Sequence, residues 1–248
     1  MFSLFKSRNY VYLCPLIMGN SSFQFKQFTV FQEKCGMKVG TDGTLLGAWA
    51  PGGKRILDVG TGTGLIALMM AQRFPDAEVM GVDIDHDAAV QASENVKRSP
   101  FAERIRIVES DVQYIDGQFD CILSNPPFFE DSLVSPDSQR TKARHTVHLT
   151  FERLFQKVKM LLTDDGIFSL IVPFNYKSRI LEEAALTGFF LVSDWAVKTT
   201  PRKAPKRFLL SFACHPKESV DAGEGVLEDA PGQRSEWYKQ FTDAFYIR

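Results

Sequence analysis

The stretch "RILDVGTGTG", residues 55–64, decides the fold, because it joins a short apolar run to glycines at every second position. Glycines in such a run let the chain turn sharply and let a ligand approach the backbone. The next residues, 63–74, have the apolar content of a buried helix. A helix that begins behind the loop offers free N–H groups there, so the stretch predicts a nucleotide-like ligand between a strand and a helix.

Strand and helix patterns continue to alternate after this loop, which is typical of a parallel sheet with crossover helices. The last two strand patterns are joined by "KTTPRKAPK" in place of a helix, so we expect them to pair antiparallel. The sequence therefore predicts an α/β fold with a seven-stranded, mostly parallel sheet and a C-terminal antiparallel hairpin. The expected strands cover residues 55–60, 78–84, 104–110, 119–125, 166–173, 189–197 and 207–215.

The remaining segments are assigned by their apolar and polar patterns. Residues 218–232 are polar and contain glycine, so we expect a surface connection there. Residues 235–248 look like a closing amphipathic segment. The expected helices cover residues 40–50, 63–74, 86–99, 150–162 and 176–188.

The composition is that of one globular domain, with 248 residues, 44% of them hydrophobic and 24% charged. We expect residues 1–22 to be a flexible extension and residues 23–248 to form a single domain, with a monomer favoured. The four cysteines lack the spacing of a zinc site, and no apolar run reaches the roughly 18 residues of a membrane span. We therefore expect a cytoplasmic protein with reduced thiols, no metal and no membrane contact.

The glycine loop differs from a dinucleotide-binding fingerprint, because its spacing is GxGxG and Asp58 precedes it. "DVGTGTG" instead resembles the first motif of class I S-adenosylmethionine-dependent methyltransferases, which have a Rossmann-like sheet. This resemblance implies S-adenosyl-L-methionine as the cofactor, with Asp83 accepting both ribose hydroxyls and Asp111 contacting the adenine amino group. The implied cofactor-binding residues are Asp58, Gly60, Gly62, Gly64, Asp83, Ile84, Asp111, Val112 and Asn125.

The motif "NPPF", residues 125–128, ends the fourth expected strand. Each proline disfavours the helical region for the residue before it, which fixes the Pro126 carbonyl near the Asn125 side chain. Neither proline has an N–H to donate, so the corner is rich in acceptors, and the flat ring of Phe128 follows. Two acceptors beside a flat ring suit an aromatic exocyclic amine, so Asn125, Pro126, Pro127 and Phe128 are the predicted catalytic residues.

This motif is similar to [ND]PP[YFW] of methyltransferases that act on adenine N6, cytosine N4, guanine N2 or the amide of glutamine. The flanking stretches "EKCGMKVGTDGTLLGAWA", "SNPPFF", "TPRKAPKRFLLSF" and "FTDAFYIR" together resemble the bacterial tRNA1(Val) adenine-37 N6-methyltransferases. That family methylates the adenosine beside the anticodon of one valine tRNA, so the resemblance implies this tRNA as the partner.

Two basic clusters agree with an RNA substrate, although the net charge of −1 argues against a uniformly basic face. One cluster follows the NPPF motif and the other lies at the tip of the expected hairpin. Each is also compatible with a solvated charged loop. The predicted RNA contacts are Arg140, Lys142, Arg144, Arg202, Lys203, Lys206 and Arg207.

Other functions stay open on sequence alone. An N-methyltransferase that acts on DNA adenine, ribosomal RNA or a protein glutamine has the same two motifs. A cofactor-binding module without catalysis is a further alternative, although the intact Asn125 and Phe128 argue against it. A nicotinamide-dependent oxidoreductase fits least, because the glycine spacing is wrong for it.

Overall fold

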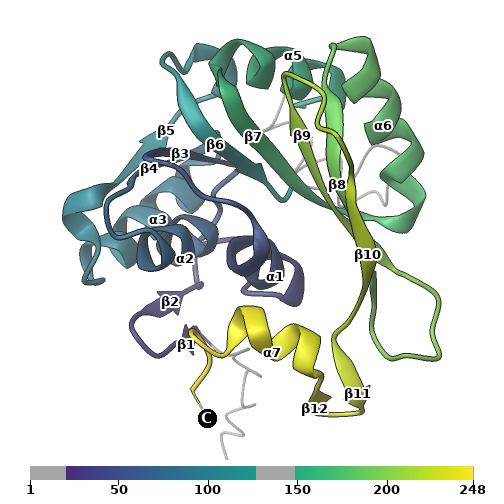
Figure 1. Ribbon diagram of the computed structural model, residues 1–248. Coiled ribbons are helices and arrows are strands. Elements are labelled where there is room, and N and C mark those ends of the chain that lie inside the picture. Colours follow the sequence, from purple (N-terminus) through teal and green to yellow (C-terminus); the bar gives the residue numbers. More distant parts are fainter. Residues whose placement is uncertain (1–20, 127–148, 248) are drawn as a thin grey trace, which may run out of the picture.

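The computed structural model describes residues 21–126 and 149–247, which contain one eight-stranded sheet flanked by helices (Figure 1). The strand order is β10-β8-β9-β7-β6-β3-β4-β5. The sheet strands are β3 (Arg55–Val59), β4 (Glu78–Asp83), β5 (Ile105–Glu109), β6 (Phe119–Ser124), β7 (Leu162–Pro173), β8 (Phe190–Lys198), β9 (Arg207–Ala213) and β10 (Asp221–Val226).

The helices cover both faces of this sheet (Figure 1). The α-helices are α1 (Thr41–Trp49), α2 (Leu65–Arg73), α3 (His86–Lys97), α5 (Phe151–Leu161), α6 (Lys177–Leu186) and α7 (Glu236–Thr242). The described ranges also contain single turns of 3₁₀ helix, namely η1 (Ala102–Arg104), η2 (Val112–Tyr114) and η3 (Phe174–Tyr176). The described residues include no helix that is both long and apolar enough to cross a membrane.

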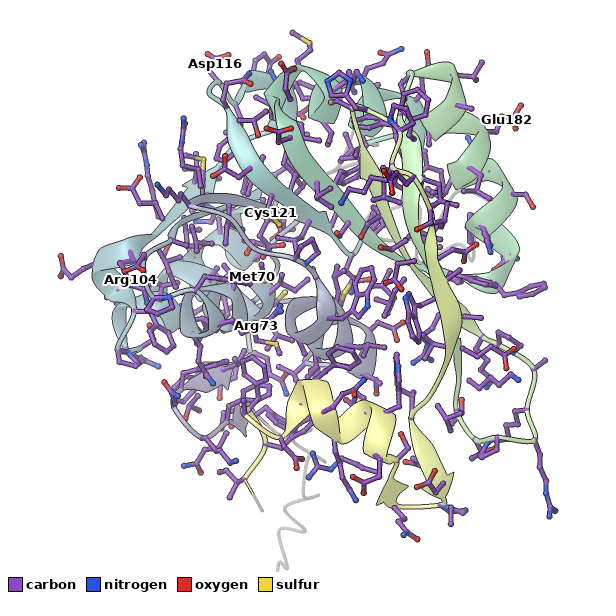
Figure 2. All side chains as sticks on the ribbon, in the orientation of Figure 1. Met70, Arg73, Arg104, Asp116, Cys121 and Glu182 are labelled. Atoms are coloured by element: carbon purple, nitrogen blue, oxygen red, sulfur yellow. The ribbon has the colours of Figure 1, made fainter. Side chains whose placement is uncertain are left out.

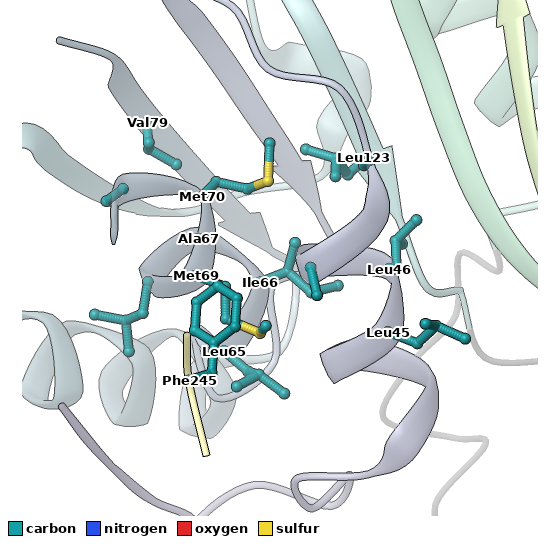
Figure 3. Close-up of a cluster of buried hydrophobic side chains, with 14 of the residues drawn as sticks. Leu45, Leu46, Leu65, Ile66, Ala67, Met69, Met70, Val79, Leu123 and Phe245 are labelled. Carbon is teal, nitrogen blue, oxygen red and sulfur yellow. The ribbon is translucent and has the colours of Figure 1, made fainter. Parts of the chain in front are cut away.

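Alternation along the central strands assigns each side chain to one of two cores. Ile56 of β3 packs in the core under α1 and α2, whereas its neighbour Leu57 packs in the core under α5 and α6. Both are fully buried, as expected for parallel strands with helices on both faces. Figure 3 shows the first core, where Met69 of α2 lies near Phe245 from the C-terminal segment and Leu46 of α1 belongs to the same cluster.

Arg73 fixes α1 against α2. Its Nη1 donates to the carbonyls of Gly47 and Ala50, at 2.9 and 2.7 Å, at the end of α1 (Figure 2). Burial lowers the pKa of this guanidinium. The last carbonyls of a helix carry partial negative charge, so they stabilise a cation at this position. The position of α1 matters because its first turn reaches the functional edge of the sheet.

The predicted α/β fold, its parallel strands and its antiparallel pairing are confirmed. β9 runs antiparallel to both β7 and β8, and β3, β4, β5, β6 and β7 are parallel. The chain moves outward from β3 to β5 and then returns to β6 on the other side of β3. This reversal between β3 and β6 is where such sheets bind ligands, at the carboxyl ends of the strands.

One prediction is wrong: residues 218–232 are not only a surface connection, because they contain β10 at the sheet edge. β10 pairs parallel with β8. Its sequence "DAGEGV" does not predict a strand, because glycine and acidic residues are poor strand formers. The two glycines are needed because indole rings fill the adjacent space. A Cβ at Gly223 would lie 2.9 Å from Trp195, and one at Gly225 would lie 2.3 Å from Trp237.

The two ends of the described chain pack together, which the sequence did not indicate. β1 (Ser22–Gln24) and β2 (Thr29–Phe31) form a hairpin, one residue ahead of the expected domain start, and Lys26 N–H donates to the Phe245 carbonyl at 2.8 Å. Phe25 stacks on Tyr246 with ring centroids 5.8 Å apart. β11 (Glu228–Ala230) and β12 (Gln233–Arg234) form a second small hairpin that leads into α7.

Gly81 of β4 tests how tightly the glycine loop rests on the sheet. A Cβ at this position would lie 2.7 Å from Thr61 Oγ1 and 2.8 Å from Ile107 Cδ1. We expect Gly81→Ala to lower the free energy of unfolding by about 1–3 kcal/mol, because the loop must shift. Urea unfolding measures the change, and Gly36→Ala is the control, since nothing lies within 4 Å of its added Cβ. Equal effects of the two substitutions would contradict the close packing.

Candidate active site

The glycine loop after β3 is held in a shape that only glycine adopts easily. Gly60, Gly62 and Gly64 have φ angles of 72°, 56° and 79°, in the left-handed region. The N–H groups of Gly60 and Thr61 both donate to the Val82 carbonyl, at 2.8 and 3.0 Å. Nothing lies within 4 Å of a Cβ added at Gly60, so a ligand has room to approach the backbone there.

Asp58 supports this loop from inside the protein. It has no exposed surface, and its Oδ2 accepts hydrogen bonds from Thr61 Oγ1 at 2.6 Å and from Ala67 N–H at 3.2 Å. Its Oδ1 has no hydrogen-bond partner, and burial raises the pKa of the carboxyl to about 7. Asp58 therefore orders the loop and the start of α2 from beneath.

Asp83 ends β4 directly beside the loop. Its Oδ2 accepts from Gly62 N–H at 2.8 Å and its Oδ1 from Asp85 N–H at 3.0 Å. Burial raises the pKa of this carboxyl, which these two hydrogen bonds oppose. Each carboxylate oxygen has a second lone pair, so both remain able to accept a hydroxyl. The next residue, Ile84, is 51% exposed and forms an apolar surface at the same edge.

Asp111 follows β5 and caps the 3₁₀ turn η2. Its Oδ1 accepts from Gln113 N–H at 2.9 Å, and its Oδ2 lies 3.7 Å from Arg153 Nη2 of α5. Val112, in contrast, is buried in the core under α5 and α6, so its side chain does not face the edge. Of this predicted pair, only Asp111 has a polar side chain.

Asn125 follows β6 on the opposite side of the glycine loop. Ser124 Oγ donates to the Val59 carbonyl at 2.9 Å, which fixes the end of β6 against the end of β3. Pro126 is buried, whereas Asn125 is partly exposed and its Nδ2 lies 3.9 Å from Met37 Sδ. The predicted residues Pro127 and Phe128 lie outside the described residues, as do Arg140, Lys142 and Arg144.

The first turn of α1 lies against this corner. A Cβ at Gly43 would be 3.9 Å from the Asn125 Nδ2, and Asp42 Oδ1 is 2.7 Å from Arg207 Nη1. Arg207 pairs in register with Pro173, the last residue of β7, so the β8–β9 hairpin tip lies at the same edge. Arg207, predicted to contact RNA, is engaged in an ion pair. The other three predicted contacts at the hairpin tip are exposed: Arg202, Lys203 and Lys206.

Two side chains at the site were not predicted. Asn95 of α3 is fully buried, accepts from Phe31 N–H at 2.9 Å and donates to the carbonyls of Phe31 and Thr63 at 2.8 and 2.9 Å. Met37 contacts Asn125 from the segment that follows β2. The signal for Asn95 was its position on the apolar face of α3, three residues after Ala92.

The site thus combines an open glycine loop, two carboxylates and an amide at the carboxyl ends of neighbouring strands. The described residues contain no group of three or more side chains suited to hold a metal ion. The arrangement suits a nucleoside-like ligand on the loop and a second, planar polar ligand beside Asn125.

Comparisons with known proteins agree with this geometry. The methyltransferase small domain family matches residues 43–187. The tRNA1(Val) (adenine(37)-N6)-methyltransferase of Bacteroides thetaiotaomicron is 47% identical over 93% of this chain and 99% of its own length. The chain belongs to the tRNA1(Val) (adenine(37)-N6)-methyltransferase family. Relatives of the same name from Phocaeicola vulgatus and Tolumonas auensis are 45% and 39% identical, each over 93% of this chain and 99% of its own.

Solved structures show the fold beyond this methyltransferase family. A predicted O-methyltransferase of Agrobacterium tumefaciens aligns with a TM-score of 0.64 and 19% identity, over 82% of this chain and 96% of that one. A glycopeptide N-methyltransferase in complex with S-adenosyl-L-methionine aligns with a TM-score of 0.53 and 11% identity, over 72% of this chain and 100% of that one. The predicted class I, Rossmann-like methyltransferase fold is therefore confirmed.

The buried carboxyl of Asp58 predicts a pH dependence of stability. Its pKa of about 7 lies above the unfolded value of about 3.9, so its proton stabilises the fold fully below that value and this contribution is lost as pH rises through 7. We expect Asp58→Asn to remove a slope of up to about 1.4 kcal/mol per pH unit between pH 5 and 7. Urea unfolding at several pH values measures it. Asp116→Asn, at an exposed site far from the loop (Figure 2), should retain the wild-type slope, and an unchanged slope in Asp58→Asn contradicts the assignment.

Proposed function

We propose that this chain transfers the methyl group of S-adenosyl-L-methionine to N6 of adenosine 37 in tRNA1(Val). The observation that carries the proposal is the Asn125–Pro126 corner, which lies across the end of β3 from the glycine loop. Support for the substrate comes from relatives of that name that match nearly the whole chain, at identities up to 47%. A tRNA substrate also favours the cytoplasm as the place of action.

The described residues fit S-adenosyl-L-methionine. The open face at Gly60 suits close approach of the methionine part, Asp83 has two oxygens for the ribose hydroxyls, and Ile84 presents an exposed apolar surface for the adenine. Asp111 is the acceptor proposed for the adenine amino group. When bound, this cofactor supplies an activated methyl on a sulfonium.

Asn125 and Pro126 act on the target amine. The Asn125 amide nitrogen is turned toward Met37, which leaves the amide oxygen as the group that accepts an N–H of adenine N6. The Pro126 carbonyl accepts the second N–H, so the amine is oriented with its lone pair toward the methyl group. Alignment of this kind converts an encounter of two molecules into a near-attack geometry. The methylated amine then loses its proton to solvent, and the face of Phe128 is proposed to stack on the base.

The hairpin tip supplies positive charge for the RNA backbone. Arg202, Lys203 and Lys206 are exposed at the same edge as Asn125, so they are proposed to contact phosphates, as are Arg140, Lys142 and Arg144. Phosphate contacts position the RNA without reading its sequence, and they make binding weaken as salt concentration rises.

The direct test of this activity is methyl transfer to RNA. Purified protein and labelled S-adenosyl-L-methionine are incubated with total tRNA from cells that lack the gene, and the methylated nucleoside is identified by mass spectrometry. We expect N6-methyladenosine in one valine tRNA. Label in DNA, ribosomal RNA or a protein, with none in tRNA, overturns the substrate and leaves the chemistry at Asn125 standing.

Asn125→Ala tests the role of the amide. We expect kcat to fall by about 100-fold, because the amide oxygen orients the target amine in the transition state. The Kd for S-adenosyl-L-methionine, measured by calorimetry, should stay within about threefold. Asn175→Ala, an exposed asparagine after the neighbouring strand β7, is the matched control. Loss of cofactor binding with turnover intact at saturation would show that the assigned role is wrong.

A further inference from the structure

A pocket of about 460 Å³ lies next to the Asn125 corner and is not used by the reaction described above. It lies between the first turn of α1, the base of the β8–β9 hairpin and the C-terminal part of the chain that includes α7. Among these elements, α1 and α7 are far apart in the sequence but contact each other (Figure 1). Its volume is in the range of sites that hold small organic ligands.

We propose that this pocket, called here the flanking-base pocket, receives one unpaired nucleobase next to the adenosine that is methylated. The inference rests on the proposed function, because it assigns a second contact to the same RNA. It adds a site that reads or holds the anticodon loop through a base, in addition to phosphate contacts that carry no sequence information.

The pocket is close enough to the Asn125 corner for a neighbouring nucleotide. Thr41 lines the pocket, and Gly43, two residues later in α1, lies against the Asn125 side chain. The pocket and the Asn125 corner therefore flank the same turn of α1. Arg207 lines the pocket as well and binds Asp42 between these two positions, at 2.7 Å. When the target adenosine is at Asn125, the base of an adjacent nucleotide can therefore reach the pocket.

The lining suits a planar group with an apolar face and a polar edge. Leu227 is buried in the wall, and Ile247 is 52% exposed and forms an apolar rim. Hydroxyl groups come from Thr41 and Thr199, and a further hydroxyl pair is formed by Tyr238 and Tyr246, whose oxygens are 3.0 Å apart. The rim thus offers donors and acceptors, which the edge of an unpaired base needs.

The charges around the pocket favour a base over a phosphate. Its lining contains two cations, Arg207 and Arg234, and one anion, Glu228. Each arginine is already paired, Arg207 with Asp42 at 2.7 Å and Arg234 with Asp243 at 3.1 Å. The five groups therefore sum to a net negative charge, which repels a phosphate. A neutral base with donors on its edge can instead donate to Glu228, because this carboxylate has more lone pairs than its hydrogen bond from Gly232 N–H, at 3.3 Å, uses.

The test uses full-length valine tRNA, assembled by ligation, with an abasic nucleotide on one side or the other of the target adenosine. For the wild-type protein we expect one of the two abasic RNAs to lose about tenfold or more in kcat/KM, as removal of a base contact does. Thr199→Trp fills the pocket and should cause a similar loss with intact RNA. The same abasic RNA should then cause no further loss, because the contact is already absent.

The controls separate this inference from the proposed function. Gln240→Trp adds the same bulk on an exposed face of α7 and should keep wild-type kcat/KM, and thermal unfolding reports whether Thr199→Trp folds. Normal methylation of both abasic RNAs by the wild-type protein overturns the pocket alone, and this measurement needs no variant. A full abasic loss that persists in folded Thr199→Trp overturns it as well. Absence of N6-methyladenosine in intact tRNA overturns the proposed function and the pocket together.

Discussion

The buried amide of Asn95 is the interaction on which the rest of the site depends. It makes three hydrogen bonds from a fully buried position, two to the backbone of Phe31 and one to the carbonyl of Thr63. One side chain thus joins the N-terminal hairpin to the glycine loop. Loss of these bonds would leave buried backbone groups unpaired, which is costly, so the loop and the hairpin are held in one arrangement.

This arrangement explains how a segment before the sheet reaches the site. Lys34 N–H donates to Gln91 of α3 at 3.2 Å, which ties the segment that follows β2 to this helix. Val39 N–H donates to Gln32 at 2.7 Å, which closes the segment on itself. Met37 then lies against Asn125, on the far side of the glycine loop. The corner proposed to orient the target amine is therefore built from β6, α1 and this segment, and not from the sheet alone.

The central fold could be predicted because its signals are local. The apolar run of β3, the alternating glycines and the apolar face of α2 are contiguous in sequence, and they fix a strand, a turn and a helix in that order. The positions of Asp83 and Asn125 followed, since parallel strands bring their carboxyl ends to one edge. The number of strands could not be predicted, because β10 contains glycines that do not look like a strand. These glycines make room for the indoles of Trp195 and Trp237, which are distant in sequence.

The site contacts that sequence could not supply are all long-range. The ion pair of Asp42 with Arg207 joins α1 to the start of β9, and each residue alone looks like an exposed charge. Asn95 looks like one more polar residue of an amphipathic helix unless one notes that it lies on the same face as the buried residues of α3. Short strands such as β1 and β2, three residues each, are too brief for any periodicity to appear.

The pairing of Arg207 also decides how charge is divided at the edge. Burial raises the pKa of Asp42, and Arg207 opposes that shift, so the carboxylate depends on this guanidinium. If Arg207 left to neutralise an RNA phosphate, Asp42, whose side chain is 41% exposed, would lose the guanidinium that opposes the rise in its pKa, and this loss disfavours the exchange. Contact of the exposed cations at the hairpin tip with a phosphate would leave the ion pair of Asp42 with Arg207 intact. Arg207 therefore lies in the wall between the Asn125 corner and the proposed flanking-base pocket, and we assign the proposed attraction of the RNA backbone to the exposed Arg202, Lys203 and Lys206.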